Sequence, residues 1–237
     1  MSPTERRRPL RLWLARLGAA LALVLAGYYG VIFHAVWRLR EHNPGMTAFI
    51  QIGLEHLRAR DPGARLQQRW VPYERISVNL KRAVIASEDQ RFLDHDGFDL
   101  EEMEKAHETN ARARRIRHGG STISQQLAKN LFLSPKRTYL RKMHEAVITM
   151  MLEHVLTKRR IFEVYLNVIE WGTGIYGAEA AAQHYYGKAA AELEPEEAAR
   201  LAAMIPNPRF YTRDPDTPYL DQRTEFLLDE MEHVRVP

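Results

Sequence analysis

The chain has 237 residues, of which 45% are hydrophobic and 27% charged, a balance that predicts one globular domain with an accessory segment. It contains no cysteine, which excludes a disulfide framework and any thiol-based metal or catalytic site. The net charge of +4 favours anionic partners, namely phospholipid, nucleic acid or a phosphate-bearing substrate.

The N-terminal segment predicts a membrane anchor. Residues 1–16 hold five arginines, whereas residues 17–37 hold no Lys, Arg, Asp or Glu and match the roughly 20 residues that cross a bilayer. Tyr28, Tyr29 and Trp37 lie toward the far end, as interfacial residues do. The excess of arginine before the span predicts a cytoplasmic N-terminus. A cleaved signal peptide is the rival interpretation, but the apolar segment is long for one and no clear small-residue cleavage site follows it.

Residues 38–75 predict a membrane-proximal linker and helix ahead of a domain of residues 76–237. The helix is expected over residues 47–60, because residues 61–63 (Asp-Pro-Gly) end it. Its apolar face fits either packing against the domain or contact with the membrane. Residues 68–73 predict an extended linker.

The pattern that begins at Leu80 predicts a helix with a carboxylate on its apolar face. Leu80, Val84, Glu88 and Phe92 recur every fourth residue, and the helix is expected to end at residues 95–97, where Gly97 suits a left-handed cap. A carboxylate on such a face is unfavourable unless it is paired or protonated. This pattern alone leaves two interpretations open, a buried structural glutamate and a functional one.

Residues 98–118 change sign along their length. Acids come first and arginines follow: Glu101, Glu102 and Glu104, then Arg112, Arg114, Arg115 and Arg117. The pattern fits either a solvated helix and loop or a flap with a cationic edge that meets a phosphate group.

A glycine pair then precedes a polar helix start. Gly119 and Gly120 allow a tight turn, and Thr122 with Gln125 predicts a capping box. A glycine loop that leads into a helix N-terminus predicts an anion site, and Gln125 and Lys129 share one helix face. An ordinary capped helix explains Thr122 and Gln125 but not the crowding of polar residues in the first two turns.

A long helix is expected to run to about Leu156. Arg141, Glu145, Ile148 and Leu152 share one of its faces, so Glu145 borders an apolar stripe one turn from Arg141. Taken alone, this is an ion pair worth roughly 0.2–0.5 kcal/mol.

The rest of the chain predicts further helices and shows no alternating strand pattern of any length, so the domain is expected to be mainly α. The expected helices span residues 158–167, 178–186, 194–205 and 224–232. Residues 172–177 match GxGxxG, but no strand precedes them, so we expect a tight turn between helices rather than a dinucleotide site.

Four ordered motifs make the chain resemble the peptidoglycan glycosyltransferases of family 51. They are Glu88-Asp89-x-x-Phe92-x-x-His95-x-Gly97, Gly120-Ser121-Thr122-Ile123-x-Gln125-Gln126-x-x-Lys129-Asn130, Arg141-Lys142-x-x-Glu145 and Lys158-x-x-Ile161-x-Glu163-x-Tyr165-Leu166-Asn167. The resemblance spans about residues 43–208. One departure is Phe162, where the family usually has Leu, and this exchange of core residues affects no catalytic position.

The resemblance implies a mainly α, lysozyme-like fold with a larger head lobe and a smaller jaw lobe beside the membrane. It implies an inverting glycosyltransferase that polymerises lipid II into β-1,4 glycan and releases undecaprenyl diphosphate, with the growing chain as donor and lipid II as acceptor. By analogy with inverting glycosidases, the two carboxyl groups should lie farther apart than the roughly 5–5.5 Å of retaining enzymes.

The resemblance also implies roles for the motif residues. Glu88 is the expected general base toward the acceptor 4-hydroxyl, and Glu145 is expected in the donor subsite. Because a bare carboxylate repels diphosphate, Glu145 needs Arg141, Lys142 or Mg²⁺ (or another divalent cation) as mediator, and no organic cofactor is expected. The residues expected to bind or position substrate are Asp89, Phe92, His95, Ser121, Thr122, Gln125, Gln126, Lys129, Asn130, Arg141 and Lys142.

The expected location is the bacterial inner membrane, with a single span, a cytoplasmic N-terminus and a periplasmic catalytic domain. The expected partners are lipid II, the growing glycan chain and membrane lipid, with cell-wall synthesis or division proteins as protein partners and no nucleic acid.

Three alternatives compete with this function. A glycan-cleaving enzyme on the same fold would also need two carboxylates, but the cationic residues argue against a neutral substrate. An inactive membrane-anchored scaffold would not need Glu88 and Glu145. A nucleic-acid binder is disfavoured because much of the positive charge lies in the N-terminal topology signal. The sequence holds no Ser-x-x-Lys or Lys-Thr-Gly motif, so no transpeptidase module is expected.

Overall fold

The structure, a computed structural model, describes residues 3–113, 120–136 and 138–237, and it divides the chain into two units, Met1–His42 and Asn43–Pro237. The first unit is the helix α1 (Pro3–Arg38) with a short turn after it. Its stretch Leu12–Arg38 has a mean hydropathy of 1.9 and is long and apolar enough to cross a membrane. The span predicted over residues 17–37 lies inside this stretch.

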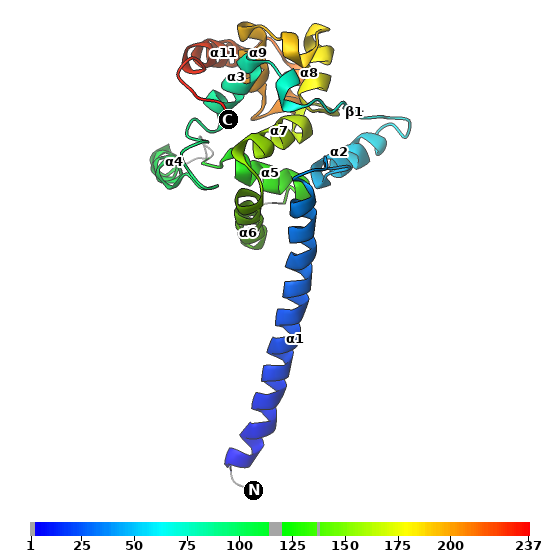
Figure 1. The fold of residues 1–237 in the computed structure, drawn as a ribbon, viewed down its shortest axis with the longest axis vertical. Helices are drawn as coiled ribbons and strands as arrows, with labels where there is room; N and C mark the ends of the chain where they lie inside the picture. The colour runs from blue at the N-terminus through cyan, green and yellow to red at the C-terminus, as the bar shows by residue number, and fades with distance from the viewer. Residues whose placement is uncertain (1–2, 114–119, 137) are drawn as a thin grey trace. The chain divides into compact units, whose positions relative to one another are not determined.

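The second unit is mainly helical, which confirms the predicted fold class (Figure 1). Its α-helices are α2 (Ala48–Arg58), α3 (Val78–Glu88), α4 (Leu100–Ala113), α5 (Ile123–Phe132), α6 (Tyr139–Val155), α7 (Lys158–Val168), α8 (Ala178–Tyr186), α9 (Pro195–Met204), α10 (Pro208–Arg213) and α11 (Pro218–Glu230). Two 3₁₀ turns, η1 (Tyr73–Arg75) and η2 (Ala190–Glu192), complete the helical elements of the described residues. The sequence did not predict α10, and α11 begins six residues before the expected Thr224.

Side-chain caps explain why most helix starts were predictable. Thr47, Ser77, Thr122, Thr138 and Thr157 each accept a hydrogen bond from the backbone N–H three residues later. Such a cap satisfies one of the backbone donors that a helix start leaves unpaired. Both halves of the predicted capping box at Thr122 are present.

The core surrounds α7, whose side chains Ile161, Phe162, Val164, Tyr165 and Leu166 are fully buried. The helix α5 packs against α6 and α7, whereas α3 packs against α9 and α11 (Figure 1). The end of α3 lies next to the start of α5, because the Asp89 carboxylate accepts a hydrogen bond from the Ile123 N–H. The predicted motifs come together at this point.

The prediction that the Leu80 helix runs to residues 95–97 is wrong, because α3 ends at Glu88. Asp89 leaves the helix with φ −168° and ψ 75°, and its carboxylate accepts a hydrogen bond from the Ile123 N–H instead. Residues 89–97 form turns, although Phe92 is still fully buried. Gly97 has the expected positive φ of 91° but caps no helix, and a Cβ there would lie 2.8 Å from Thr149 Cγ2.

The described part of the chain also contains three short strands that the sequence pattern did not indicate. The strands β2 (Glu170–Gly172) and β3 (Ile175–Tyr176) form an antiparallel hairpin, and β1 (Gln67–Gln68) pairs with β3 in parallel, giving the order β1-β3-β2. The GxGxxG segment is thus a tight turn, as predicted, but within a hairpin. Gly177 has φ +83°, and a Cβ there would lie 2.7 Å from the Asn167 carbonyl oxygen.

Candidate active site

Glu88 stands at the end of α3 with both carboxylate oxygens hydrogen-bonded. The Ser87 hydroxyl donates to Oε1 at 3.1 Å, and the Gln126 amide donates to Oε2 at 2.8 Å. The residue is half-buried, and burial raises the pKa of its carboxyl above the ordinary value, against the opposing effect of these two hydrogen bonds. A fixed carboxylate with a raised pKa has the properties of a general base.

The Gln126 side chain is itself held by Tyr165. The Tyr165 hydroxyl donates to Gln126 Oε1 at 3.0 Å, so the amide nitrogen of Gln126 faces Glu88. Tyr165 is fully buried, and burial followed by the charges of Glu88 and Asp89 raises its pKa well above the ordinary value. Tyr165 is therefore a neutral donor that fixes the orientation of the Gln126 amide.

Tyr165 and Ser87 are site residues that the sequence analysis did not assign. Tyr165 stands in the fourth motif, but only its place in that motif was noted. A signal was present: a tyrosine on the buried face of a helix needs a partner for its hydroxyl. Nothing in the local pattern indicated that the partner would be Gln126.

Glu145 lies on α6 and is only 3% exposed. Arg141 Nη1 donates to its Oε2 at 2.5 Å, and Lys142 donates to its Oε1. Lys142 also donates to the Ser121 hydroxyl at 3.4 Å. The predicted association of Glu145 with Arg141 is confirmed, and Lys142 joins it as a second cation.

Lys129 on α5 lies within electrostatic reach of both carboxylates, Glu88 and Glu145. Burial lowers the pKa of its ammonium group, while the charges of Glu145 and Glu88 oppose that shift. Arg141 and Lys142 act on the same group and lower its pKa further. Lys129, Arg141 and Lys142 therefore share one electrostatic environment with the two carboxylates, and the charge of Arg223 also acts on Glu88, so positive charge is in excess, which suits an anionic substrate group.

Several residues predicted to bind substrate instead connect α3 to α5. The side chains of His95 and Asp89 are 7% and 3% exposed and lie 3.0 Å apart. Because the Gly97 N–H donates to His95 Nδ1, the other ring nitrogen carries the proton that is donated to Asp89. Asp89 also accepts from the Ile123 N–H at 2.9 Å, so this carboxylate fixes the end of α3 on the start of α5.

Further polar residues of the second motif are likewise occupied by protein groups. Thr122 donates to the Gly97 carbonyl at 2.7 Å, and Gln125 accepts from the Thr122 N–H at 3.1 Å. Asn130 donates to the Gln126 carbonyl at 2.7 Å. The Asp89 carboxylate accepts a hydrogen bond from the first N–H of α5, so a carboxylate of the protein itself lies at this helix start. The predicted binding of a substrate anion there stays a prediction.

Parts of two predictions lie outside the described residues. One is the glycine turn, because Gly119 is not described. The other is the cationic edge, because the side chains of Arg112, Arg114, Arg115 and Arg117 are not described. The acidic half of that segment is described and forms α4.

The described residues offer few free donors to the predicted divalent cation. The described part of the chain holds no group of three or more His, Asp or Glu side chains that could bind a metal. Both oxygens of Glu145 accept hydrogen bonds from cationic side chains, which competes with metal coordination. The divalent cation that the sequence suggested stays a prediction.

Comparisons with known proteins agree with the motif pattern. The family model described as Transglycosylase matches residues 55–232. A biosynthetic peptidoglycan transglycosylase of Azoarcus sp. (strain BH72) is 57% identical over 226 residues, covering 95% of this chain and 97% of the relative. Proteins of the same description from Dechloromonas aromatica (strain RCB) and Janthinobacterium sp. (strain Marseille) are 54% and 51% identical over 230 residues, covering 93% and 97% of this chain and 99% and 98% of the relatives.

Proposed function

Since this chain belongs to the transglycosylase family and is a peptidoglycan glycosyltransferase that polymerises glycan strands, we propose that Glu88 is the general base of an inverting transfer onto lipid II. The observation that supports this most is the placement of Glu88. Its carboxyl has a raised pKa, a fixed orientation through Gln126, and Lys129 within electrostatic reach. A sugar hydroxyl is a poor nucleophile, so a positioned base is the group that this reaction needs.

The proposed step is a direct displacement. The acceptor 4-hydroxyl oxygen forms a bond to the anomeric carbon of the donor sugar as the bond from that carbon to the diphosphate oxygen breaks. Glu88 takes the hydroxyl proton, and undecaprenyl diphosphate leaves with the electron pair. One displacement without a sugar–enzyme intermediate inverts the anomeric centre, which yields a β-linked product.

The cations Lys129, Arg141 and Lys142 neutralise the diphosphate as it leaves. Diphosphate is a good leaving group, so fixed positive charge helps it more than a proton donor does. Glu145 is a positioning residue in this proposal, because its carboxylate holds Arg141 and Lys142 on one side of the site. Asp89, His95, Thr122 and Gln125 position α3 and α5 rather than contact the substrate.

We further propose that α1 is an anchor in the inner membrane, with the N-terminus in the cytoplasm and the catalytic unit in the periplasm. The lipid of the substrate stays in the bilayer, so a tethered enzyme meets it at a higher effective concentration. Cell-wall synthesis or division proteins are the proposed protein partners.

Two incubations test this function against a glycan-cleaving enzyme. Labelled lipid II is expected to give a polymer, whereas purified glycan is expected to stay intact. Soluble fragments released from the glycan, without polymer from lipid II, would contradict the proposal.

The pH dependence of the reaction reports the state of Glu88. The base must be deprotonated, and its raised pKa means that kcat/KM falls with decreasing pH at a midpoint above the ordinary range of glutamate. The Gln126 hydrogen bond lowers that pKa, so Gln126→Leu is expected to move the midpoint to still higher pH. Initial rates at low lipid II concentration across pH measure both effects. A midpoint within the ordinary glutamate range would contradict the proposed environment of Glu88.

Tyr165→Phe is expected to lower kcat/KM by roughly 3- to 10-fold, because one hydrogen bond that orients Gln126 is lost. If Tyr165 acts through Gln126, the double variant with Gln126→Ala should be no worse than Gln126→Ala alone. Tyr186→Phe is the matched control, since that hydroxyl donates to the Glu197 carbonyl on α9. Fully additive effects in the double variant would exclude this positioning role.

A further inference from the structure

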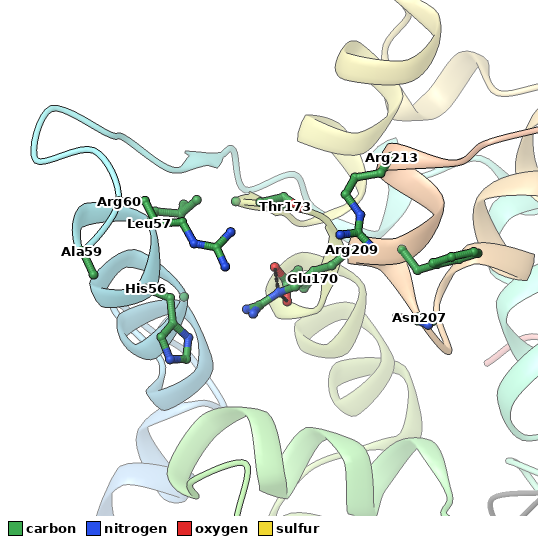
Figure 2. Close-up of a pocket in the computed structure, with 12 residues that line it drawn as sticks. His56, Leu57, Ala59, Arg60, Glu170, Thr173, Asn207, Arg209 and Arg213 are labelled. Carbon is green, nitrogen blue, oxygen red and sulfur yellow. Dashed lines mark hydrogen bonds and ion pairs between the residues drawn. The ribbon is translucent and has the colours of Figure 1, made fainter.

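A pocket of about 510 Å³ lies between the C-terminal half of α2, the β2–β3 hairpin and α10 (Figure 2). Neither Glu88 nor Glu145 lines it, and the mechanism above does not use it. The volume lies within the roughly 300–1,000 Å³ of pockets that bind small molecules. It has room for a sugar or a short peptide.

The walls of this pocket are strongly cationic. Its charged or titratable lining comprises His56, Arg60, Arg209 and Arg213 against a single acid, Glu170. Both oxygens of Glu170 accept from Arg209 Nε, at 2.9 and 3.0 Å, so this acid is already paired.

The other two arginines are available to a ligand. Among the described residues, the side chains of Arg60 and Arg213 have no hydrogen-bond or ion-pair partner. Figure 2 shows them extending from opposite walls toward the Glu170–Arg209 pair. Two unpaired guanidinium groups that converge on one space fit a carboxylate or phosphate, which accepts paired hydrogen bonds from arginine.

The pocket adjoins the cationic side of the active site. Tyr176 interacts electrostatically with Arg209, and its hydroxyl donates a hydrogen bond to the Phe49 carbonyl at 3.3 Å. The Phe49 ring in turn lies 5.4 Å from Lys129 Nζ. At 1.5 Å per residue, the pocket residues of α2, Gly53 to Leu57, lie roughly 6 to 12 Å along the helix from Phe49, and Ala59 and Arg60 follow just after its end. A glycan strand bound in the active site near Lys129 can therefore extend along α2 to the pocket.

We propose that this pocket binds a carboxylate of the peptide carried by the growing glycan strand, beyond the reacting sugar. The proposal rests on the proposed function, because it takes the strand to be the donor. Sugar hydroxyls are neutral and gain little from guanidinium groups, whereas a peptide carboxylate makes charge-assisted hydrogen bonds with them. The apolar side chains of Leu57 and Phe210 complete the walls and suit the alkyl parts of a peptide.

The test measures binding without turnover. A fluorescent, lipid-free glycan fragment that bears its peptide is titrated into the full-length protein in detergent at low salt. The double variant Arg60→Gln/Arg213→Gln is expected to bind it roughly tenfold more weakly than the wild type, and the same fragment without its peptide should not distinguish the two proteins. Arg58→Gln is the matched control, because Arg58 is exposed at the end of α2, two residues before Arg60, but does not line the pocket.

Equal binding of the peptide-bearing fragment by the wild type and the double variant would overturn the proposal. So would a double variant that loses affinity only for phosphatidylglycerol vesicles, since the pocket would then bind a lipid headgroup. Arg60 and Arg213 are exposed, so the variants are expected to fold, and a thermal melt checks this. Because the assay involves no catalysis, an active Glu88→Gln enzyme would refute the proposed base without affecting this result.

Discussion

Replacing Glu88 with glutamine is expected to lower the rate of lipid II polymerisation by roughly 10²- to 10⁴-fold, the contribution of a positioned general base. Glutamine has nearly the same size, and its side-chain oxygen can still accept from Gln126 or Ser87. It cannot take the proton of the acceptor hydroxyl. Polymerisation of labelled lipid II by purified wild type and variant measures the loss.

The stability of this variant separates catalysis from folding. Burial raises the pKa of Glu88, which means that the folded protein disfavours its charge. The neutral glutamine should therefore leave the melting temperature at neutral pH unchanged or raise it. Glu225→Gln removes an exposed carboxylate from α11 and should polymerise lipid II as the wild type does. A folded Glu88→Gln protein with undiminished polymerisation would refute the assignment of the base.

Most helices could be predicted because their signals are local. A threonine three residues before a free backbone N–H, as at Thr122 or Thr157, marks a helix start in whatever fold surrounds it. The end of α3 could not be predicted in this way. The apolar spacing continues to Phe92, but the chain turns at Asp89, whose carboxylate bonds to Ile123, 34 residues away. The hairpin strands span only two and three residues, too short for an alternating pattern to show.

In the candidate site, too, contacts between residues close in sequence could be predicted, and contacts between distant residues could not. The association of Glu145 with Arg141 is one helical turn long, so residue spacing sufficed to predict it. The position of Tyr165 depends on a hydrogen bond to Gln126, 39 residues earlier, and no local pattern indicates it. A polar residue after a helix end or in a turn has the same sequence pattern whether it faces a substrate or a neighbouring helix. For this reason Asp89, like His95, was expected in the substrate-binding set, although it lies in buried contacts between helices.

Lys129→Met is expected to lower kcat by roughly 10²- to 10³-fold, the effect of removing one preorganised group that stabilises developing charge. Lys129 is half-buried and its charge interacts with both Glu88 and Glu145, so its loss removes positive charge that both carboxylates share. If its charge matters mainly as the diphosphate leaves, kcat and kcat/KM should fall together. Rates at several lipid II concentrations measure both constants.

The alkaline side of the pH profile gives an independent check on Lys129. Burial lowers its pKa, so the ammonium loses its proton at a lower pH than an ordinary lysine, and polymerisation should fall there. Lys129→Arg keeps its charge at all accessible pH values and should move this limit to higher pH, even where its kcat is reduced. Lys105→Met, on the exposed face of α4, should change neither constant. An alkaline limit that is the same in Lys129→Arg and the wild type would assign it to another group, and the charge of Lys129 would then not control the rate.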